Sequence, residues 1–158
     1  SNKGNIESAQ KERQMIESLK DTNDVLHLDS IYYPASMLLE IADSLALGEI
    51  AISNNDYQSA IQYFANAVSV QDALPYTEPP FWYYPTRLSL GKAYLLSDQA
   101  DEAEVVFKEN LKRYPRNGWA LYGLIQALET QNKDSSMVQK QFDIIWQNAD
   151  VELTSSRF

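Results

Sequence analysis

The sequence predicts an all-α fold, built as a solenoid of three helix hairpins with one more helix before them. Two observations support this prediction. Apolar side chains recur at three- and four-residue steps in several segments, which is the period of an amphipathic helix. One spacing, Gly-x₁₁-Ala-x₃-Phe, also occurs twice, first at Gly48, Ala60 and Phe64 and again at Gly91, Ala103 and Phe107. A fixed offset between small and aromatic residues is typical of repeated pairs of packed helices.

The first 35 residues are expected to form a helix and a connector ahead of the repeats. Residues 5–21 place a narrow apolar stripe among charged and amide side chains, so a helix here needs a partner surface. From residue 22 to 35 the apolar pattern is irregular, and Pro34 favours extended backbone in the residue before it. We interpret residues 1–35 as an N-terminal helix and connector, which could be the end of an upstream repeat.

The repeat domain is predicted at residues 36–149, and its first hairpin runs to about residue 72. Gly48 has no side chain, so it lets the partner helix approach the first helix of this hairpin closely where the two cross. Asp56 follows two asparagines in the expected turn, and its carboxylate can cap the second helix. On that second helix the small Ala60 permits close approach, and Phe64 fills the gap beside it.

The second hairpin is predicted from about residue 85 to 115, and the third begins at Asn117, which can cap its first helix. In the third hairpin Ser135 stands where the spacing expects alanine, and Phe142 falls three residues later than expected. The register of the last helix is therefore open, although its apolar face is present. This hairpin is expected to close the array. Residues 150–158 are expected to be a frayed tail.

The second copy of the spacing is the fuller one, with Leu90, Gly91, Tyr94, Ala103, Phe107 and Pro115. This set resembles the tetratricopeptide repeat (TPR), and the resemblance implies a tetratricopeptide-type right-handed helical solenoid. Residues 48–128 are also similar to the C-terminal region of a group of bacterial TPR proteins with an EPPxWYYPxR segment. The matching residues are Glu78, Pro79, Pro80, Trp82, Tyr83, Tyr84, Pro85 and Arg87, followed by Asn117, Gly118, Trp119 and Gly123. By this resemblance the chain is the end of a longer array.

An insert separates the first two hairpins. The interval from Gly48 to Gly91 exceeds the TPR length of about 34 residues by roughly nine. The additional residues must lie at 73–84, where three prolines prevent a continuous helix. The next helix then begins either at Pro80, with a kink at Pro85, or at Pro85 itself.

The TPR resemblance implies a groove for a partner on the first helix of each hairpin. The positions carried over to this groove include Leu45, Glu49, Ile52, Leu88, Lys92, Leu95 and Leu124. The groove is mostly apolar, and Lys92 is its only basic residue, which argues against the carboxylate-clamp members that hold acidic tails. We expect an apolar peptide or partner helix to bind there, unless residues 5–35 cover the groove themselves.

The insert offers a second candidate site at Glu78, Trp82, Tyr84 and Arg87. Its rings could stack on a planar ligand or a sugar, with Arg87 anchoring a carboxylate or phosphate. The same residues could instead wrap the junction between repeats, with the rings in the core and Glu78 paired with Arg87. Burial and mutual satisfaction of these side chains would argue for the structural alternative.

Composition argues against several classes of function. The chain has 158 residues and a net charge of −9, which argues against nucleic-acid binding. Its one basic group, Lys108, Lys112, Arg113 and Arg116, is expected at a helix end, where it complements the helix dipole. The chain has no cysteine, so thiolate catalysis and cysteine-based zinc sites are excluded. Charged residues interrupt the longest apolar stretches, which argues against membrane insertion. The sole histidine, His27, has no metal-ligand spacing around it.

The sequence also lacks a nucleophile elbow, a phosphate loop and a dinucleotide motif, so we do not expect an enzyme. We predict a protein–protein interaction scaffold without cofactor or metal. The alternatives are a small-molecule or sugar sensor that uses the insert, and a structural terminal cap of a longer TPR array. The location is left open, with the cytoplasm favoured over the periplasm, which would require that a signal has been removed. The partner's identity and the oligomeric state are left open.

Overall fold

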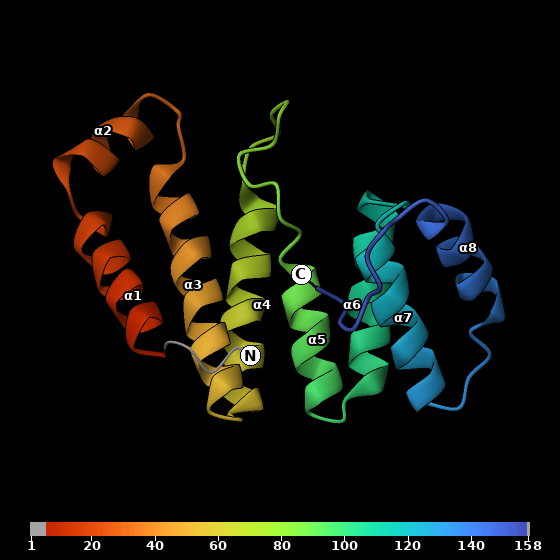
Figure 1. Cartoon of the computed structure of the whole chain (residues 1–158). Coiled ribbons are helices and arrows are strands. Elements are labelled where there is room, and N and C mark those ends of the chain that lie inside the picture. The colour runs from red at the N-terminus through yellow and green to blue at the C-terminus, as the bar shows by residue number, and fades with distance from the viewer. Residues whose placement is uncertain (1–5, 158) are drawn as a thin grey trace. The chain divides into compact units, whose positions relative to one another are not determined.

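The computed structural model describes residues 6–157, and every regular element in that range is an α-helix (Figure 1). The predicted all-α class is therefore confirmed. The helices fall into two compact units, residues 1–86 and residues 87–158, which are described separately. None of the helices in the described range is long and apolar enough to cross a lipid bilayer.

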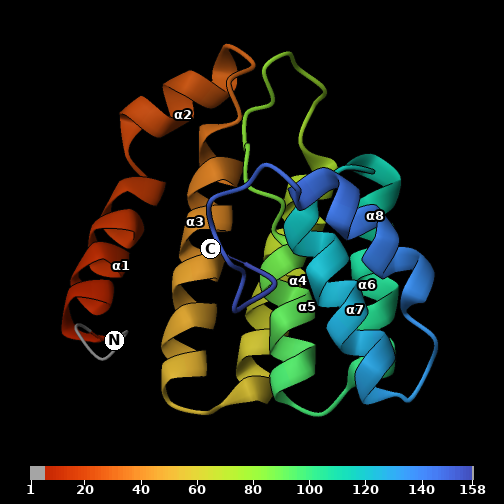
Figure 2. The ribbon, with the colours of Figure 1, turned by 45° about the vertical axis from the view of Figure 1, so that its right-hand side comes forward.

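Unit 1 contains α1 (Ile6–Lys20), α2 (Asn23–Ser30), α3 (Ala35–Ser53) and α4 (Tyr57–Ala73). α3 and α4 form a hairpin, and α1 and α2 pack against α3 (Figures 1 and 2). The turn of the hairpin lies where the sequence predicts it. Asp56 caps α4, because its carboxylate accepts a hydrogen bond from the backbone N–H of Ser59 at 3.1 Å.

A glycine facing a phenylalanine closes the α3–α4 hairpin. Phe64 of α4 is 1% exposed, and its ring lies so close to Gly48 of α3 that a Cβ atom on residue 48 would overlap it. Ala60, one turn earlier on α4, is fully buried. The first copy of the Gly-x₁₁-Ala-x₃-Phe spacing therefore has a steric origin, since the glycine makes room for the ring.

Residues 22–35, expected to be a connector, contain the short helix α2. α2 has eight residues and only one buried side chain, Val25. A single buried position cannot show a helical period, so the sequence pattern did not reveal this helix. Tyr32 then takes a left-handed backbone conformation with φ 65°. The carboxylate of Asp29 accepts a hydrogen bond from the backbone N–H of Ser36 at 3.1 Å, which links α2 to the first turn of α3.

The segment after α4, residues 74–86, forms no helix (Figure 1). We call it the α4–α5 segment. The next helix begins at Arg87, so the predicted start at Pro80 is wrong and the alternative start at Pro85 is two residues early. Pro85 does not enter the helix.

Unit 2 contains α5 (Arg87–Leu96), α6 (Ala100–Arg113), α7 (Gly118–Thr130) and α8 (Ser136–Trp146). Its centre is the fully buried ring of Phe107 on α6. That ring lies against both Gly91 of α5 and Gly123 of α7, and a Cβ atom at either glycine would overlap it. One phenylalanine thus packs three helices, whereas the sequence pattern linked it only to Gly91.

α8 packs against α7 through aromatic rings. Trp146 lies against Gly118, where a Cβ atom would overlap the indole. The indole of Trp146 stacks on Phe142, with ring centroids 5.6 Å apart, and meets Trp119 edge-on at 5.1 Å. The late position of Phe142 is thereby explained, because the ring that faces a glycine in this hairpin is Trp146.

The chain after α8 differs from the frayed tail that was expected. The indole N–H of Trp146 donates a hydrogen bond to the carbonyl oxygen of Val151 at 2.8 Å. Further along, Ser156 is only 1% exposed. The segment is therefore not helical, and it is exposed from residue 147 to 152 but buried again at Ser156.

Candidate functional site

An apolar cavity of about 410 Å³ lies in unit 1 among α1, α2 and α3. Its lining residues are Leu19, Thr22, Asp24, Val25, Leu28, Tyr33, Ala35, Leu38, Leu39, Ala42 and Trp82. Only four of these side chains, Thr22, Asp24, Tyr33 and Trp82, carry polar groups. Ligand pockets in proteins are typically about 300–1,000 Å³ and mostly apolar, so this cavity suits an apolar side chain or a small apolar molecule.

The helical period of α3 builds one wall of the cavity. Ala35, Leu38, Leu39 and Ala42 all line it, and their three- and four-residue spacing places them on one helix face. The two alanines are small, so this face leaves space at both ends of the leucine pair. The hollow is thus a consequence of where alanine replaces a larger apolar residue.

Large apolar side chains are also exposed on α1, on α2 and in the turn after α2. The exposed side chains are Met15, Leu19, Leu26, Ile31, Tyr32 and Tyr33, with exposures from 43% to 92%. Single exposed apolar residues are ordinary, but a concentration of them beside an apolar cavity is typical of an interaction surface. Leu19 and Tyr33 of this set also line the cavity, and we therefore take the exposed apolar residues and the cavity together as one candidate site.

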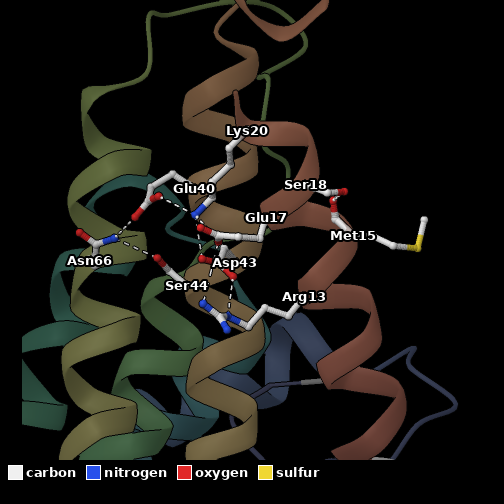
Figure 3. A network of polar contacts seen from close by, with 9 residues as sticks. All are labelled: Arg13, Met15, Glu17, Ser18, Lys20, Glu40, Asp43, Ser44 and Asn66. Carbon is white, nitrogen blue, oxygen red and sulfur yellow. Dashed lines mark hydrogen bonds and ion pairs between the residues drawn. The ribbon is translucent and has the colours of Figure 1, made fainter. Parts of the chain in front are cut away.

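Ion pairs hold α1 against α3 (Figure 3). Asp43 of α3 is 5% exposed and accepts hydrogen bonds from Arg13 at 3.0 Å and Lys20 at 2.8 Å, both on α1. Lys20 also donates to Glu40 at 3.3 Å. Burial disfavours the charged form of Lys20, but the hydrogen bonds to Asp43 and Glu40 outweigh that effect and raise its pKa. Because α1 forms a wall of the cavity, these ion pairs set the position of that wall.

α4 joins the same polar network through one side chain, Asn66 (Figure 3). Its amide nitrogen donates to the carboxylate of Glu40 at 2.7 Å and to the hydroxyl of Ser44 at 2.9 Å. Glu40 therefore accepts from α1 and from α4 at once. The network links all three long helices of unit 1.

A single glutamine holds the α4–α5 segment to the end of α4. The amide nitrogen of Gln71 donates to the carbonyl of Tyr84 at 2.9 Å, and its amide oxygen accepts from the backbone and hydroxyl of Thr86 at 2.9 and 2.7 Å. Phe81 of the segment meets Tyr33 edge-on, with ring centroids 5.3 Å apart. These contacts fix the segment on both sides of Trp82, the one residue of it that lines the cavity.

The α4–α5 segment contains two buried polar groups without a hydrogen-bond partner, the indole N–H of Trp82 and the hydroxyl of Thr77. Leaving such a group unpaired costs about 1–3 kcal/mol. Tyr83 in the same segment is 82% exposed. The aromatic residues of the segment are therefore neither wholly buried nor fully satisfied, so the segment does not meet the condition set for a purely structural role.

The other site residues predicted in unit 1 lie away from the cavity lining. Leu45, Glu49 and Ile52, in the second half of α3, are half-buried. Glu78 is exposed, and its carboxylate accepts a hydrogen bond from the hydroxyl of Tyr76 at 2.6 Å, which raises the pKa of Tyr76. The cavity instead uses the first half of α3.

The site residues predicted in unit 2 have two different environments. Leu88 and Leu124 are 1% and 4% exposed, so they belong to the core of the unit. Arg87 is the half-buried first residue of α5. Lys92 and Leu95 line a second cavity, of about 300 Å³. Its remaining lining residues are Leu96, Gln126, Thr130, Thr154, Ser155 and Ser156.

The acidic residues and the histidine form no metal site in the described range. No group of three or more His, Cys, Asp or Glu side chains within residues 6–157 could hold an ion. His27 lies exposed on α2. At the start of α6, the hydrogen bond between the side chains of Asp101 and Glu102 lowers the pKa of Asp101 and raises that of Glu102, and both residues are exposed.

Comparison with protein-family models, with curated proteins and with solved structures finds no match. The resemblance to TPR proteins therefore stays a prediction. The geometry of the chain itself is what supports a function.

Three residues that position the candidate site were not singled out from the sequence as such: Asp43, Asn66 and Gln71. Asp43 did carry a signal, because a carboxylate inside an apolar helix must be paired when it is buried. Gln71 carried none, since its partners are backbone groups of the α4–α5 segment. Their positions depend on the path of the chain, which residue types alone do not encode.

Proposed function

We propose that this chain is a non-enzymatic protein-interaction module that binds an amphipathic helix of a partner protein at unit 1. One apolar side chain of that helix enters the cavity among α1, α2 and α3. Its neighbours cover the exposed apolar side chains of α1 and α2. The observation that supports this most directly is the apolar cavity of about 410 Å³ beside those side chains. Apolar anchors that fill preformed pockets dominate the energetics of many interfaces.

Charge at the cavity favours a helix with basic residues beside its apolar face. Asp24 lines the cavity, and Asp21, just before α2, is exposed. The cations of α1 nearest to them in the sequence, Arg13 and Lys20, are paired with Asp43. The whole chain has a net charge of −9. Complementary charge increases the association rate and rejects like-charged partners, so an acidic peptide is disfavoured.

This proposal moves the binding surface from the predicted groove to the beginning of α3. α1 and α2 were considered as segments that could cover the groove. In the proposed site they form walls of the cavity, together with Trp82 of the α4–α5 segment. The predicted chemistry, burial of an apolar partner segment, is retained.

Titration calorimetry with designed helical peptides tests the proposal. The probe is a synthetic amphipathic helix of leucine and lysine, and its matched control carries glutamate in place of lysine. The basic peptide should bind at least about tenfold more tightly than the acidic one. Asp24→Lys should narrow or reverse this preference, whereas Asp101→Lys, an exposed position in unit 2, should leave it unchanged.

A second pair of variants tests the cavity itself. Ala42→Phe places a ring inside the cavity and should weaken binding of the basic peptide by at least about tenfold. Ala65→Phe adds the same ring to an exposed position on α4 and should have no effect. Circular dichroism and urea unfolding would establish that both variants are folded. Unchanged binding by a folded Ala42→Phe variant would refute the site.

A small apolar molecule with one hydrogen-bond acceptor is a second candidate ligand for the same cavity. The unpartnered indole N–H of Trp82 favours it, because a ligand carbonyl that reached this group would recover the cost of leaving it unpaired. A sugar fits less well, since seven of the eleven lining residues have side chains without any polar group. An aryl ketone and the matched aryl alkane separate the candidates. Preference for the ketone that Trp82→Phe abolishes would support the small molecule over the partner helix.

A further inference from the structure

The segment after α8, residues 147–157, returns to α5 and α7 of unit 2 (Figure 2). Its first part is anchored by Trp146, whose indole is packed between Phe142 and Trp119 and donates a hydrogen bond to the carbonyl of Val151. This hydrogen bond spans five residues, so it reverses the direction of the chain directly after the helix. The segment therefore leaves α8 from a fixed point.

The second part of the segment lies against a surface made by two helices. We call this surface the α5/α7 face, and it consists of Lys92, Leu95, Leu96, Gln126 and Thr130. Residues 154–156 complete the cavity of about 300 Å³ on this face. The segment bends here, without regular secondary structure, and its sequence is Thr-Ser-Ser. A surface of one cation, one amide, one hydroxyl and two leucines thus contacts three small hydroxylated residues.

Two features show that this contact is incompletely packed. Ser156 is 1% exposed, yet its hydroxyl has no hydrogen-bond partner. A cavity large enough for several water molecules also remains between the segment and the helices. A buried hydroxyl without a partner costs about 1–3 kcal/mol, and empty space provides no compensating dispersion contacts. The segment is buried on the α5/α7 face, but it is not optimised to stay there.

We propose that the α5/α7 face is a docking surface for a non-helical segment of small hydroxylated residues, and that residues 152–157 occupy it as an internal ligand. A partner segment of the same chemistry binds only when the internal one leaves. Tethering gives the internal segment an effective concentration in the millimolar range, so even a weak contact keeps the face occupied. This inference concerns unit 2 and stands independently of the cavity proposed in unit 1.

Fluorescence anisotropy with a labelled peptide tests the proposal on the full chain. The probe is a synthetic peptide with the sequence of residues 149–158, ADVELTSSRF. Ser156→Asp introduces a charge at the buried position and should expel the internal segment. Ala149→Asp adds the same charge at an exposed position outside residues 152–157 and away from the cavity lining, so it serves as the matched control.

The peptide should bind the Ser156→Asp variant about tenfold more tightly than it binds the wild type or the Ala149→Asp variant, because the internal competitor has left. Adding Leu95→Asp to Ser156→Asp should abolish that binding, since it places a charge on the face itself. Equal binding by wild type and Ser156→Asp would show that the face is not occupied. Absence of binding by both would show that it is not a docking surface. Either result overturns the proposal.

Discussion

The two units use the same contact, a phenylalanine ring against a glycine, to pack a helix pair. They use different interactions, ion pairs in unit 1 and aromatic stacking in unit 2, to hold their other helices. In unit 1 Phe64 packs against Gly48, and in unit 2 Phe107 packs against Gly91. Unit 1 then attaches α1 through charges gathered around the buried Asp43, and an apolar cavity remains between the helices. Unit 2 attaches α8 through stacked aromatic rings, and the segment after it leaves a cavity with a mostly polar lining.

This comparison shows that the contacts that build the helix pairs differ from the contacts that build the cavities. The contact between a glycine and a phenylalanine recurs within the α3–α4 and α5–α6 hairpins, and in the third hairpin Trp146 takes the place of the phenylalanine. The elements attached to each hairpin are not repeats of one another, and the cavities form where those elements meet the hairpins. The ligand chemistry of each unit therefore follows from its attached segments, and variants that break each attachment test this separation.

The largest loss of stability is expected at Phe107 of unit 2, and it should exceed the loss at Phe64 of unit 1. Phe107→Ala should destabilise unit 2 by about 3–5 kcal/mol, because a fully buried ring that touches α5 and α7 together is lost. Phe64→Ala removes a ring that faces one glycine, so its cost should lie at the lower end of that range. Urea unfolding followed by far-ultraviolet circular dichroism measures both. A smaller loss for Phe107→Ala than for Phe64→Ala would contradict the three-helix role of Phe107.

Gly123→Ala provides the internal control for that prediction. In the wild type its methyl group overlaps the Phe107 ring, which should cost about 1–3 kcal/mol. In the Phe107→Ala background the same methyl group enters the vacated space and should be neutral or stabilising. The sign of the effect should thus change with the background, and additive effects would exclude a direct contact.

The next effect is expected at Asp43, the centre of the charged attachment in unit 1. Asp43→Ala leaves Arg13 and Lys20 without their buried partner and should cost about 2–3 kcal/mol, less than a fully buried pair because Arg13 is 38% exposed. Hydrogen exchange should show faster opening of α1 while α4 keeps its protection. Glu17→Ala removes the 57% exposed partner of the same cations and should cost under about 0.5 kcal/mol. Equal losses of stability for the two variants would mean that the ion pairs of Asp43 contribute no more than an exposed surface ion pair does.

The hairpins were predictable because their causes are local in the sequence. Asp56 and Asn117 each cap a helix by accepting from an N–H three residues ahead, as their positions after a turn and before an apolar run indicate. The glycine–phenylalanine offset likewise depends on one helix pair. α2 was missed because one buried residue, Val25, gives no period. The third hairpin was ambiguous because Trp146 takes the place beside a glycine that phenylalanine has elsewhere.

The candidate site was less predictable, since it depends on contacts between segments far apart in the sequence. Trp82 was singled out for its aromatic neighbourhood, but nothing local shows that it meets α1, α2 and α3. The cavity itself arises from Ala35 and Ala42, and small residues in a helix give no sign of whether a neighbour fills the space beside them. Ser156 is comparable, because its burial depends on a chain reversal set by Trp146.

The smallest effect should appear in acid, at Glu104 of unit 2. Glu104 of α6 accepts from Lys108 at 2.5 Å and from Lys133 at 2.7 Å, and these hydrogen bonds lower its pKa to about 2. A carboxylate with a depressed pKa in the folded state contributes stability above its ordinary pKa near 4.5, and that contribution is lost as pH falls from 4.5 towards 2. The loss should be about 1–2 kcal/mol, because Lys108 and Lys133 are 54% and 51% exposed.

Urea unfolding of unit 2 between pH 6 and pH 2 measures this term, with Glu104→Gln as the variant that should remove it. Glu109→Gln, at a 47% exposed acid paired only with Lys112, should leave the pH profile unchanged. In unit 1 the pH dependence has the opposite sign for Lys20, whose pKa is raised in the folded state. Its contribution to stability is fully present below its ordinary pKa of 10.5, and it is lost only as the solution becomes strongly alkaline. The same acid profile for wild type and Glu104→Gln would mean that this ion pair does not hold α6 to the loop after α7. Of the two ion-pair networks, the one around Asp43 in unit 1 would then be the one that stabilises the fold.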